Sequence, residues 1–171
     1  MKTRGDFSLS FGIIFSIFII AAVIAVAGYA IMHFLSLKNC TELGLYGRDL
    51  QNKLDRAWNA DSVEGELFSG IVPWNVKKVC IGDISQAPKD SEEYKALRRF
   101  SDSGSNLFFY PIPSSCDIIH MKLEHAMFKQ KFECVDVENG RATLRLDKGS
   151  FDSLVNVCGD KEKSCSLQTG G

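Results

Sequence analysis

The chain has 171 residues, of which 45% are hydrophobic and 24% charged, and its formal net charge at pH 7 is −1. It contains no long run of basic residues, so we expect no nucleic-acid partner. About 100 to 130 residues remain beyond an N-terminal apolar segment, which is enough for one modest domain with a small core.

That apolar segment covers residues 7–37 and contains no Asp, Glu, Lys or Arg. About 20 apolar residues with a rise of 1.5 Å each cross the ~30 Å hydrocarbon core of a bilayer. We therefore predict a transmembrane helix over residues 7–37, in contact with the lipid bilayer and preceded by a head of residues 1–6. Small side chains near one face favour either self-association of this helix or ordinary lipid contact: Ala21, Ala22, Ala25 and Gly28.

The charge of the head predicts the orientation. Lys2 and Arg4 precede the apolar segment, and short basic segments stay in the cytoplasm, whereas a long C-terminal domain can be translocated. We expect a single-pass protein of the cell membrane with a cytoplasmic N-terminus and its C-terminal domain outside. The alternative is a cleaved signal peptide with its site at Ala25-Val26-Ala27. Because the apolar segment continues well beyond that site, to Leu37, a retained anchor is favoured.

Residues 38–62 repeat apolar side chains at intervals of three or four, which indicates an amphipathic juxtamembrane helix. Its apolar face consists of Leu43, Tyr46, Leu50, Leu54, Ala57 and Trp58. Gly44 and Gly47 each weaken a helix by about 1 kcal/mol relative to Ala. The first half of this segment therefore either bends or breaks, or joins the preceding helix in one continuous rod.

The remainder reads mostly as short strands separated by polar segments. Residues 63–158 are predicted to form an extracytoplasmic, antiparallel β-rich domain, and residues 159–171 a flexible tail. The expected fold class is α+β, with a transmembrane helix extended by an amphipathic helix and followed by a small disulfide-stapled domain. The segment 118–128 is expected to be helix or loop. Strands are expected at 65–72, 76–84, 107–110 and 154–157, and a short helix capped by Ser91 at 91–100.

A β-hairpin is predicted around Asn139-Gly140, because this dipeptide between two β-rich segments is a strong signal for a two-residue turn. Such a turn pairs Glu138 with Arg141. It also pairs Val137 with Ala142 and Val135 with Leu144.

All the cysteines follow the apolar segment; they are Cys40, Cys80, Cys116, Cys134, Cys158 and Cys165. Small domains outside the cytoplasm often use disulfides as staples, so these residues are disulfide candidates. Six cysteines allow 15 pairings, and the spacing suggests only that Cys158 and Cys165 close a short loop and that Cys40 ties the helix to the domain. The alternative is a set of reduced cytosolic cysteines. No Cys-x-x-Cys motif supports a zinc or redox site, so we expect no metal and no cofactor.

Catalytic motifs are not evident. His120 and His125 are five residues apart, whereas a metalloprotease helix places its histidines four apart on one face. We find no nucleophile elbow, phosphate-binding loop or dinucleotide fingerprint. The chain is therefore not expected to be an enzyme.

A basic residue and Gly5 stand directly before an uncharged segment that begins Phe7-Ser8-Leu9. This pattern resembles the processing region of type IV pilin-like proteins, in which cleavage follows the glycine and the apolar helix becomes the spine of a filament. The resemblance implies a processing site between Gly5 and Asp6. Ser10 occupies the fifth mature position, where bacterial members of that family have Glu and archaeal members do not need it.

Three further segments resemble uncharacterised single-pass membrane proteins of archaea: Val72-Pro73-Trp74, Val79-Cys80 and Phe108-Phe109-Tyr110-Pro111. That resemblance implies an envelope protein and no particular activity. We therefore expect a membrane-anchored extracytoplasmic protein with a structural or protein-binding role in the cell envelope. Its partner is expected to be another envelope protein or a second copy joined through the transmembrane helix. The alternative is a pilin-like filament subunit processed after Gly5.

Overall fold

The structure is a computed structural model that describes residues 6–113, 116 and 118–165. It contains two compact units, Met1–Lys38 and Asn39–Gly171. The second unit contains every strand and all three disulfides, and we refer to it as the domain.

A single helix, α1 (Asp6–Asn59), covers both the apolar segment and the amphipathic segment that follows it. Among the described residues, it is the one helix that is long and apolar enough to cross a membrane. The side chains of its apolar window are exposed, whereas those of a core helix in a soluble protein are mostly buried. The helix continues through Gly44 and Gly47, so of the two alternatives left open by the sequence the continuous one is formed.

The part of α1 inside the domain buries the predicted apolar face. Leu43, Leu50 and Leu54 are completely buried. Trp58, at the end of this face, is 39% exposed. The two glycines suit this packing, because a methyl group on Gly47 would overlap the side chain of Met121. A glycine there lets the helix approach the strand closely, which offsets its low helix propensity.

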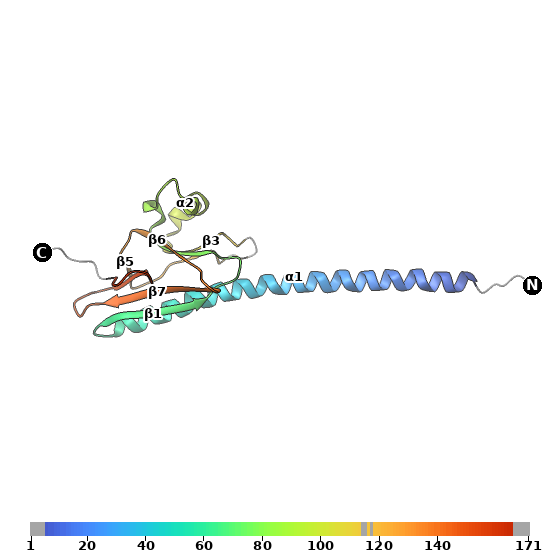
Figure 1. Cartoon of the computed structure of the whole chain (residues 1–171), viewed down its shortest axis with the longest axis horizontal. Helices are drawn as coiled ribbons and strands as arrows, with labels where there is room; N and C mark the ends of the chain where they lie inside the picture. Colours follow the sequence, from blue (N-terminus) through green and yellow to red (C-terminus); the bar gives the residue numbers. More distant parts are fainter. Residues whose placement is uncertain (1–5, 114–115, 117, 166–171) are drawn as a thin grey trace, which may run out of the picture. The chain divides into compact units, whose positions relative to one another are not determined.

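Two small sheets form the rest of the domain (Figure 1), and antiparallel pairs predominate. The α+β class predicted from the sequence is confirmed. One sheet has the order β1 (Val63–Ile71), β7 (Arg141–Lys148), β8 (Val155–Gly159) and β5 (Ala126–Phe128). The other has the order β4 (His120–Met121), β3 (Leu107–Tyr110), β2 (Lys78–Gly82) and β6 (Phe132–Asp136).

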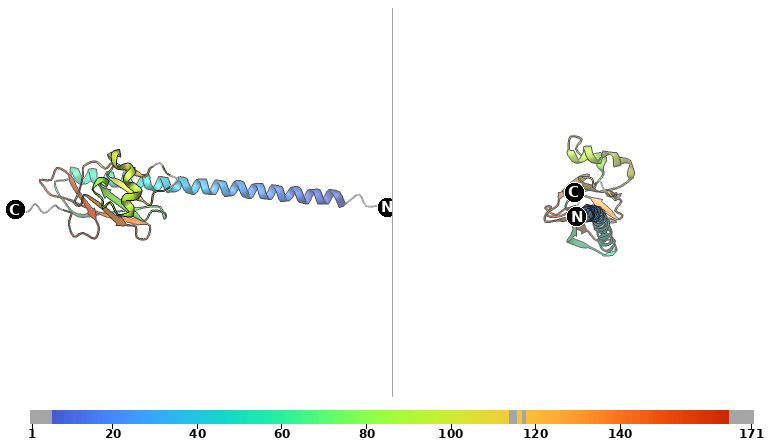
Figure 2. Two further views of the ribbon diagram at one scale, coloured as in Figure 1. Left: turned by 90° about the horizontal axis from the view of Figure 1, so that it is seen from above. Right: turned by 90° about the vertical axis from the view of Figure 1, so that its right-hand side faces the viewer.

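The main core lies between the domain part of α1 and the inward faces of both sheets. Alternation along β2 and β3 divides their side chains between two cores, since successive residues of a strand point to opposite faces. Val79 and Phe109 enter the main core, whereas Cys80 and Phe108 enter a smaller core. Figures 1 and 2 show the short helix α2 (Glu92–Leu97) on the side of the second sheet that this smaller core occupies.

The predicted helix capped by Ser91 is confirmed, because the Ser91 hydroxyl accepts a hydrogen bond from the Tyr94 N–H at 3.1 Å. A second contact joins α2 to β2. Lys78 Nζ donates to Glu93 Oε1 at 2.7 Å. This bond lowers the pKa of Glu93 and raises the pKa of Lys78. Two 3-10 helices lie on either side of α2 in sequence, Ile84–Gln86 and Arg98–Ser103.

The helix or loop predicted for residues 118–128 is partly right: residues 118–119 and 122–125 are loop, but the segment also contains β4 and β5, which were not predicted. Each of these strands is only two or three residues long, too short to show a period of two. β4 pairs with β3, and β5 pairs in parallel with β8. Their partners are distant in sequence, and that pairing was not visible in the local pattern.

The hairpin prediction is correct for the turn and wrong for the strands. Asn139 and Gly140 both have positive φ angles, 52° and 72°, as a type I′ turn requires, and Glu138 forms a bridge with Arg141. The strands then enter different sheets, where Val135 pairs with Val79 and Leu144 pairs with Phe68. Val135 and Leu144 are both buried in the main core, each from its own sheet, and this packing replaces a local ladder.

Part of the segment expected as a flexible tail has a defined position. Gly159 is the last residue of β8, and Cys165 is completely buried. The Cys165 N–H donates to an Asp147 carboxylate oxygen at 2.5 Å. Residues 166–171 lie outside the described part of the chain.

Candidate binding groove beside the first strand

Three disulfides join all the cysteines: Cys40–Cys116, Cys80–Cys134 and Cys158–Cys165. The short C-terminal loop suggested by the spacing is formed. Cys40 joins α1 to a segment 76 residues away. Cys80 and Cys134 occupy opposite positions on the paired strands β2 and β6.

The two histidines of the domain lie in separate surroundings. His120 Nδ1 lies 2.8 Å from the Ser105 hydroxyl, and its ring packs against Phe100 with the centroids 4.6 Å apart. His125 instead stacks on Trp58 at 3.9 Å. Within the described ranges, no group of three or more His, Cys, Asp or Glu side chains is placed to hold a metal ion.

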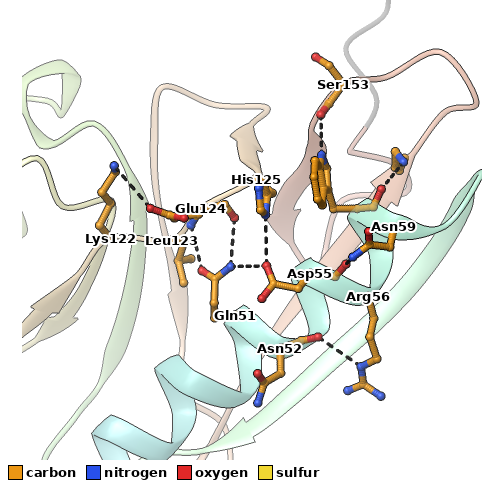
Figure 3. Close-up of polar contacts among 12 residues, drawn as sticks. Gln51, Asn52, Asp55, Arg56, Asn59, Lys122, Leu123, Glu124, His125 and Ser153 are labelled. Carbon is orange, nitrogen blue, oxygen red and sulfur yellow. Dashed lines mark hydrogen bonds and ion pairs between the residues drawn. The ribbon is translucent and has the colours of Figure 1, made fainter.

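His125 belongs to a polar network that attaches α1 to the loop before β5 (Figure 3). Its Nδ1 lies 3.2 Å from Asp55 Oδ1. Gln51 accepts a hydrogen bond from the Glu124 N–H at 2.9 Å and donates one to Asp55 at 2.7 Å. These contacts hold two surface segments together, so they account for His125 and Glu124 structurally.

Lys148 caps the C-terminal end of α1. Its Nζ donates to the carbonyl oxygens of Trp58 and Ala60, both at 2.6 Å. The last carbonyls of a helix have no partner within the helix and carry partial negative charge, so a cation there is stabilising. No local pattern predicts the Lys148 contact or the bond between Gln51 and Glu124, because their partners are 90 and 73 residues apart in sequence.

A groove runs between the domain part of α1 and β1. It consists of two adjoining hollows of about 410 Å³ and about 340 Å³ that share Asp49, Phe68 and Ser69. Exposed apolar side chains border it, with Leu67 52% and Ile71 56% exposed. The strand that forms its wall, β1, is an edge strand of its sheet. Edge strands carry backbone groups that an added extended segment can pair with.

Polar contacts give the groove a defined wall. Arg141 donates from Nε to the Ser69 hydroxyl and from Nη2 to the Ser69 carbonyl, both at 3.2 Å. Lys53 forms an ion pair with Glu66. Sequence reasoning did not find this groove, since its walls come from segments that meet only in the fold.

Tyr46 forms part of the groove and contributes an unusual hydroxyl. Its side chain is 2% exposed, and its ring makes edge contacts with Phe68 and Phe109 at centroid distances of 5.2 and 5.8 Å. The hydroxyl is buried and has no hydrogen-bond partner among the described residues. Burial raises the pKa of this hydroxyl far above its ordinary value.

We expect Tyr46→Phe to raise the free energy of unfolding by about 1 kcal/mol, because a buried hydroxyl without a partner is desolvated at a cost of about 1–3 kcal/mol. Tyr46→Leu is the matched variant, since it also removes the ring contacts and is expected to lower stability. Urea unfolding of the full chain in detergent measures both. A destabilised Tyr46→Phe variant would show that the hydroxyl has a partner in solution.

A second titratable group, Glu133 on β6, predicts a pH dependence. Burial raises the pKa of its carboxyl from the usual 4.5, although the Gly159 N–H donates to it at 3.2 Å and acts in the opposite direction. The folded protein therefore holds this proton to a higher pH than the unfolded chain. The free energy of unfolding therefore falls as the pH rises from the usual pKa of the carboxyl to its raised pKa in the folded protein.

We expect Glu133→Gln to be more stable than the original chain above this window and equally stable below it. Glutamine keeps an acceptor oxygen for Gly159 and carries no charge. Urea unfolding at about pH 7 and about pH 3 measures the difference. Glu64→Gln, at an exposed position on β1, is the control. A difference that is the same at both pH values would contradict the expectation.

No family model matches the chain, and neither the curated proteins nor the solved structures compared with it give a match. Of the expected processing site, Gly5 lies outside the described residues, and Asp6 is the first residue of α1.

Proposed function

We propose that the chain is a single-pass membrane-anchored protein whose domain lies outside the cytoplasm and binds another protein of the cell envelope. One observation carries this proposal. A helix long and apolar enough to cross a membrane continues without interruption into a domain closed by three disulfides. Disulfides persist in oxidising compartments, and an anchor places the domain at the membrane.

The orientation proposed, with the N-terminus in the cytoplasm, rests on Lys2 and Arg4 and is supported by the disulfides. The basic head and the disulfides both support a domain outside the cytoplasm. The partner proposed is an extended segment of an envelope protein, added as a strand along β1. The groove beside β1 supports this, because strand addition needs an edge strand and pockets for alternate side chains.

Labelling of intact cells with a membrane-impermeant maleimide tests the location. We expect no labelling before reduction, because all the cysteines are bonded, and labelling of intact cells after treatment with an impermeant phosphine reductant. Labelling that appears only after permeabilisation, and without reductant, would place the cysteines in the cytoplasm and contradict the proposal.

A second candidate is a pilin-like filament subunit. One observation favours it, because α1 is one continuous helix from Asp6 to Asn59 that leads into a domain with antiparallel strands and a C-terminal disulfide. N-terminal sequencing of the mature protein separates the two candidates. A chain that begins at Asp6 supports the filament subunit, and one that keeps Met1 contradicts it.

A further inference from the structure

The free edge of β1 presents the backbone groups of alternate residues. The Val72 N–H donates to the Gly140 carbonyl at 3.0 Å, and hydrogen-bonded pairs alternate with non-hydrogen-bonded pairs in an antiparallel ladder. In the register of β1 and β7, the backbone groups of Phe68 and Gly70 therefore point to β7. The residues whose backbone groups point to the free edge are Leu67, Ser69 and Ile71.

The side chains of the same three residues lie on the outer face of the sheet and are exposed. Phe68, which stands between two of them, enters the main core. Successive side chains of a strand point to opposite faces, so a segment added along this edge alternates in the same way. Its side chains opposite Leu67, Ser69 and Ile71 lie on the outer face, and the two between them point toward α1.

The two hollows of the groove match the two inward side chains of such a segment. The hollow of about 340 Å³ has Leu67, Phe68 and Ser69 in its β1 wall. The hollow of about 410 Å³ extends from Phe68 to Ile71. Figure 1 shows β1 beside the domain part of α1, which forms the other wall. The groove therefore has space below an added strand, opposite Phe68 and opposite Gly70.

Arg141 occupies the middle of the free edge. It lies on β7 opposite Ile71, and its guanidinium extends over β1 to Ser69. Nη2 donates to the Ser69 carbonyl and Nε to the Ser69 hydroxyl, both at 3.2 Å. This carbonyl is one of the acceptors that an added strand needs, so strand addition displaces the guanidinium. A charged side chain on an edge strand also protects it from indiscriminate pairing.

The displaced guanidinium has no carboxylate to bind within the described part of the chain. Arg141 forms no ion pair there, and its printed bonds end on the neutral oxygens of Ser69. Glu42 belongs to the α1 wall of the groove, which faces the inward side chains of an added segment. The other carboxylates nearby have cationic partners: Asp49 with Arg48, Glu66 with Lys53, and Glu138 with Lys161.

We propose that the segment bound along β1 carries an acidic side chain opposite Ser69, with an apolar side chain two residues away on either side. The carboxylate takes the guanidinium of Arg141, while the apolar side chains pack on Leu67 and Ile71. Hydrogen bonds between ions are about twice as strong as those between neutral groups, so the exchange favours an acidic partner. This inference rests on the proposed function, because it takes strand addition along β1 as given.

A second copy of the chain, paired through its own β1, does not supply this carboxylate. Only residues whose backbone groups point to the free edge can pair with Ser69 in an antiparallel ladder. Leu67, Ser69 and Ile71 meet that condition, and none of them is acidic. The backbone groups of Glu66 point to β7, so Glu66 cannot stand opposite Ser69. The acidic segment therefore belongs to a different protein.

Two blocked peptides test the inference against the isotope-labelled full chain in detergent. Thr-Val-Thr-Glu-Thr-Val-Thr has the proposed pattern, and the matched peptide has Gln in place of Glu. We expect both to shift the backbone amide signals of β1, and the Glu peptide to bind about fivefold more tightly at low salt. We expect Arg141→Gln to abolish this preference. The control Arg98→Gln, at an exposed position at the end of α2, should retain it.

Equal affinity of the two peptides for the original chain, with shifts along β1, overturns the acidic preference and leaves strand addition intact. Absence of shifts along β1 with either peptide overturns strand addition and this inference together. A preference that persists in Arg141→Gln overturns the role of Arg141. If Arg141→Gln does not fold, Arg141→Lys replaces it. Lysine keeps the charge but cannot bind a carboxylate through two parallel bonds, so we expect a reduced preference.

Discussion

Removal of the disulfide Cys40–Cys116 or Cys80–Cys134 by paired alanine substitutions is expected to lower the free energy of unfolding by about 4 kcal/mol. These bonds close loops of 76 and 54 residues, and the entropy that a cross-link removes from the unfolded chain grows with loop length. Such a loss is a large fraction of the stability of a typical small domain, about 5–15 kcal/mol. Urea unfolding of the full chain in detergent, without reductant, measures it.

The third disulfide provides the matched comparison. Cys158–Cys165 closes a loop of only 7 residues, for which the same relation gives about 2 kcal/mol. Replacement of both residues by alanine should therefore cost about half as much as removal of either long-range bond. Equal costs for all three pairs would show that loop entropy does not govern the contribution of these bonds.

Gly82→Ala is expected to lower the free energy of unfolding by about 3 kcal/mol or more, through two separate effects. Gly82 ends β2 with a φ of 105°, where an L side chain is strained. A methyl group there would also overlap the carbonyl oxygen of Lys131 and lie 3.1 Å from the Phe132 Cα. Both are backbone atoms, so the start of β6 would have to move to remove the overlap.

Gly104→Ala shows the first effect alone, the strain of a positive φ. Gly104 has a positive φ of 68°, but a methyl group on it would meet no atom within 4 Å. Its cost is the conformational one alone, about 1 kcal/mol. Thermal or urea unfolding of the two variants under identical conditions gives the difference. If Gly82→Ala were as mild as Gly104→Ala, the strand pair at β2 and β6 would be more adaptable than the structure indicates.

Elements defined by local signals were predictable from the sequence. The apolar face of α1 was readable because Leu43, Leu50 and Leu54 recur at helical spacing, and all three are buried. Ser91 identified the start of α2 because a capping hydroxyl needs only its neighbours. The α+β class followed from such signals. Local reasoning failed at Gly47, where close packing against Met121 retains a glycine inside the helix.

Features that depend on long-range pairing were not predictable. The Asn139-Gly140 turn was predicted correctly. β6 and β7, however, pair with strands of two different sheets rather than with each other. β4 and β5 are too short to show a pattern and exist because β3 and β8 pair with them. The groove beside β1 likewise forms only when α1 packs beside β1, so no sequence motif predicts the groove.

Intact mass spectrometry of the protein purified from membranes of its native host, without reductant, tests most directly whether it is an anchored protein with a disulfide-closed domain. We predict recovery in the membrane fraction and a chain that retains residues 7–37. We also predict a mass lower than that of the reduced chain by two hydrogens for each of the three disulfides. A chain with six free thiols, or one that has lost the apolar segment, would contradict this account.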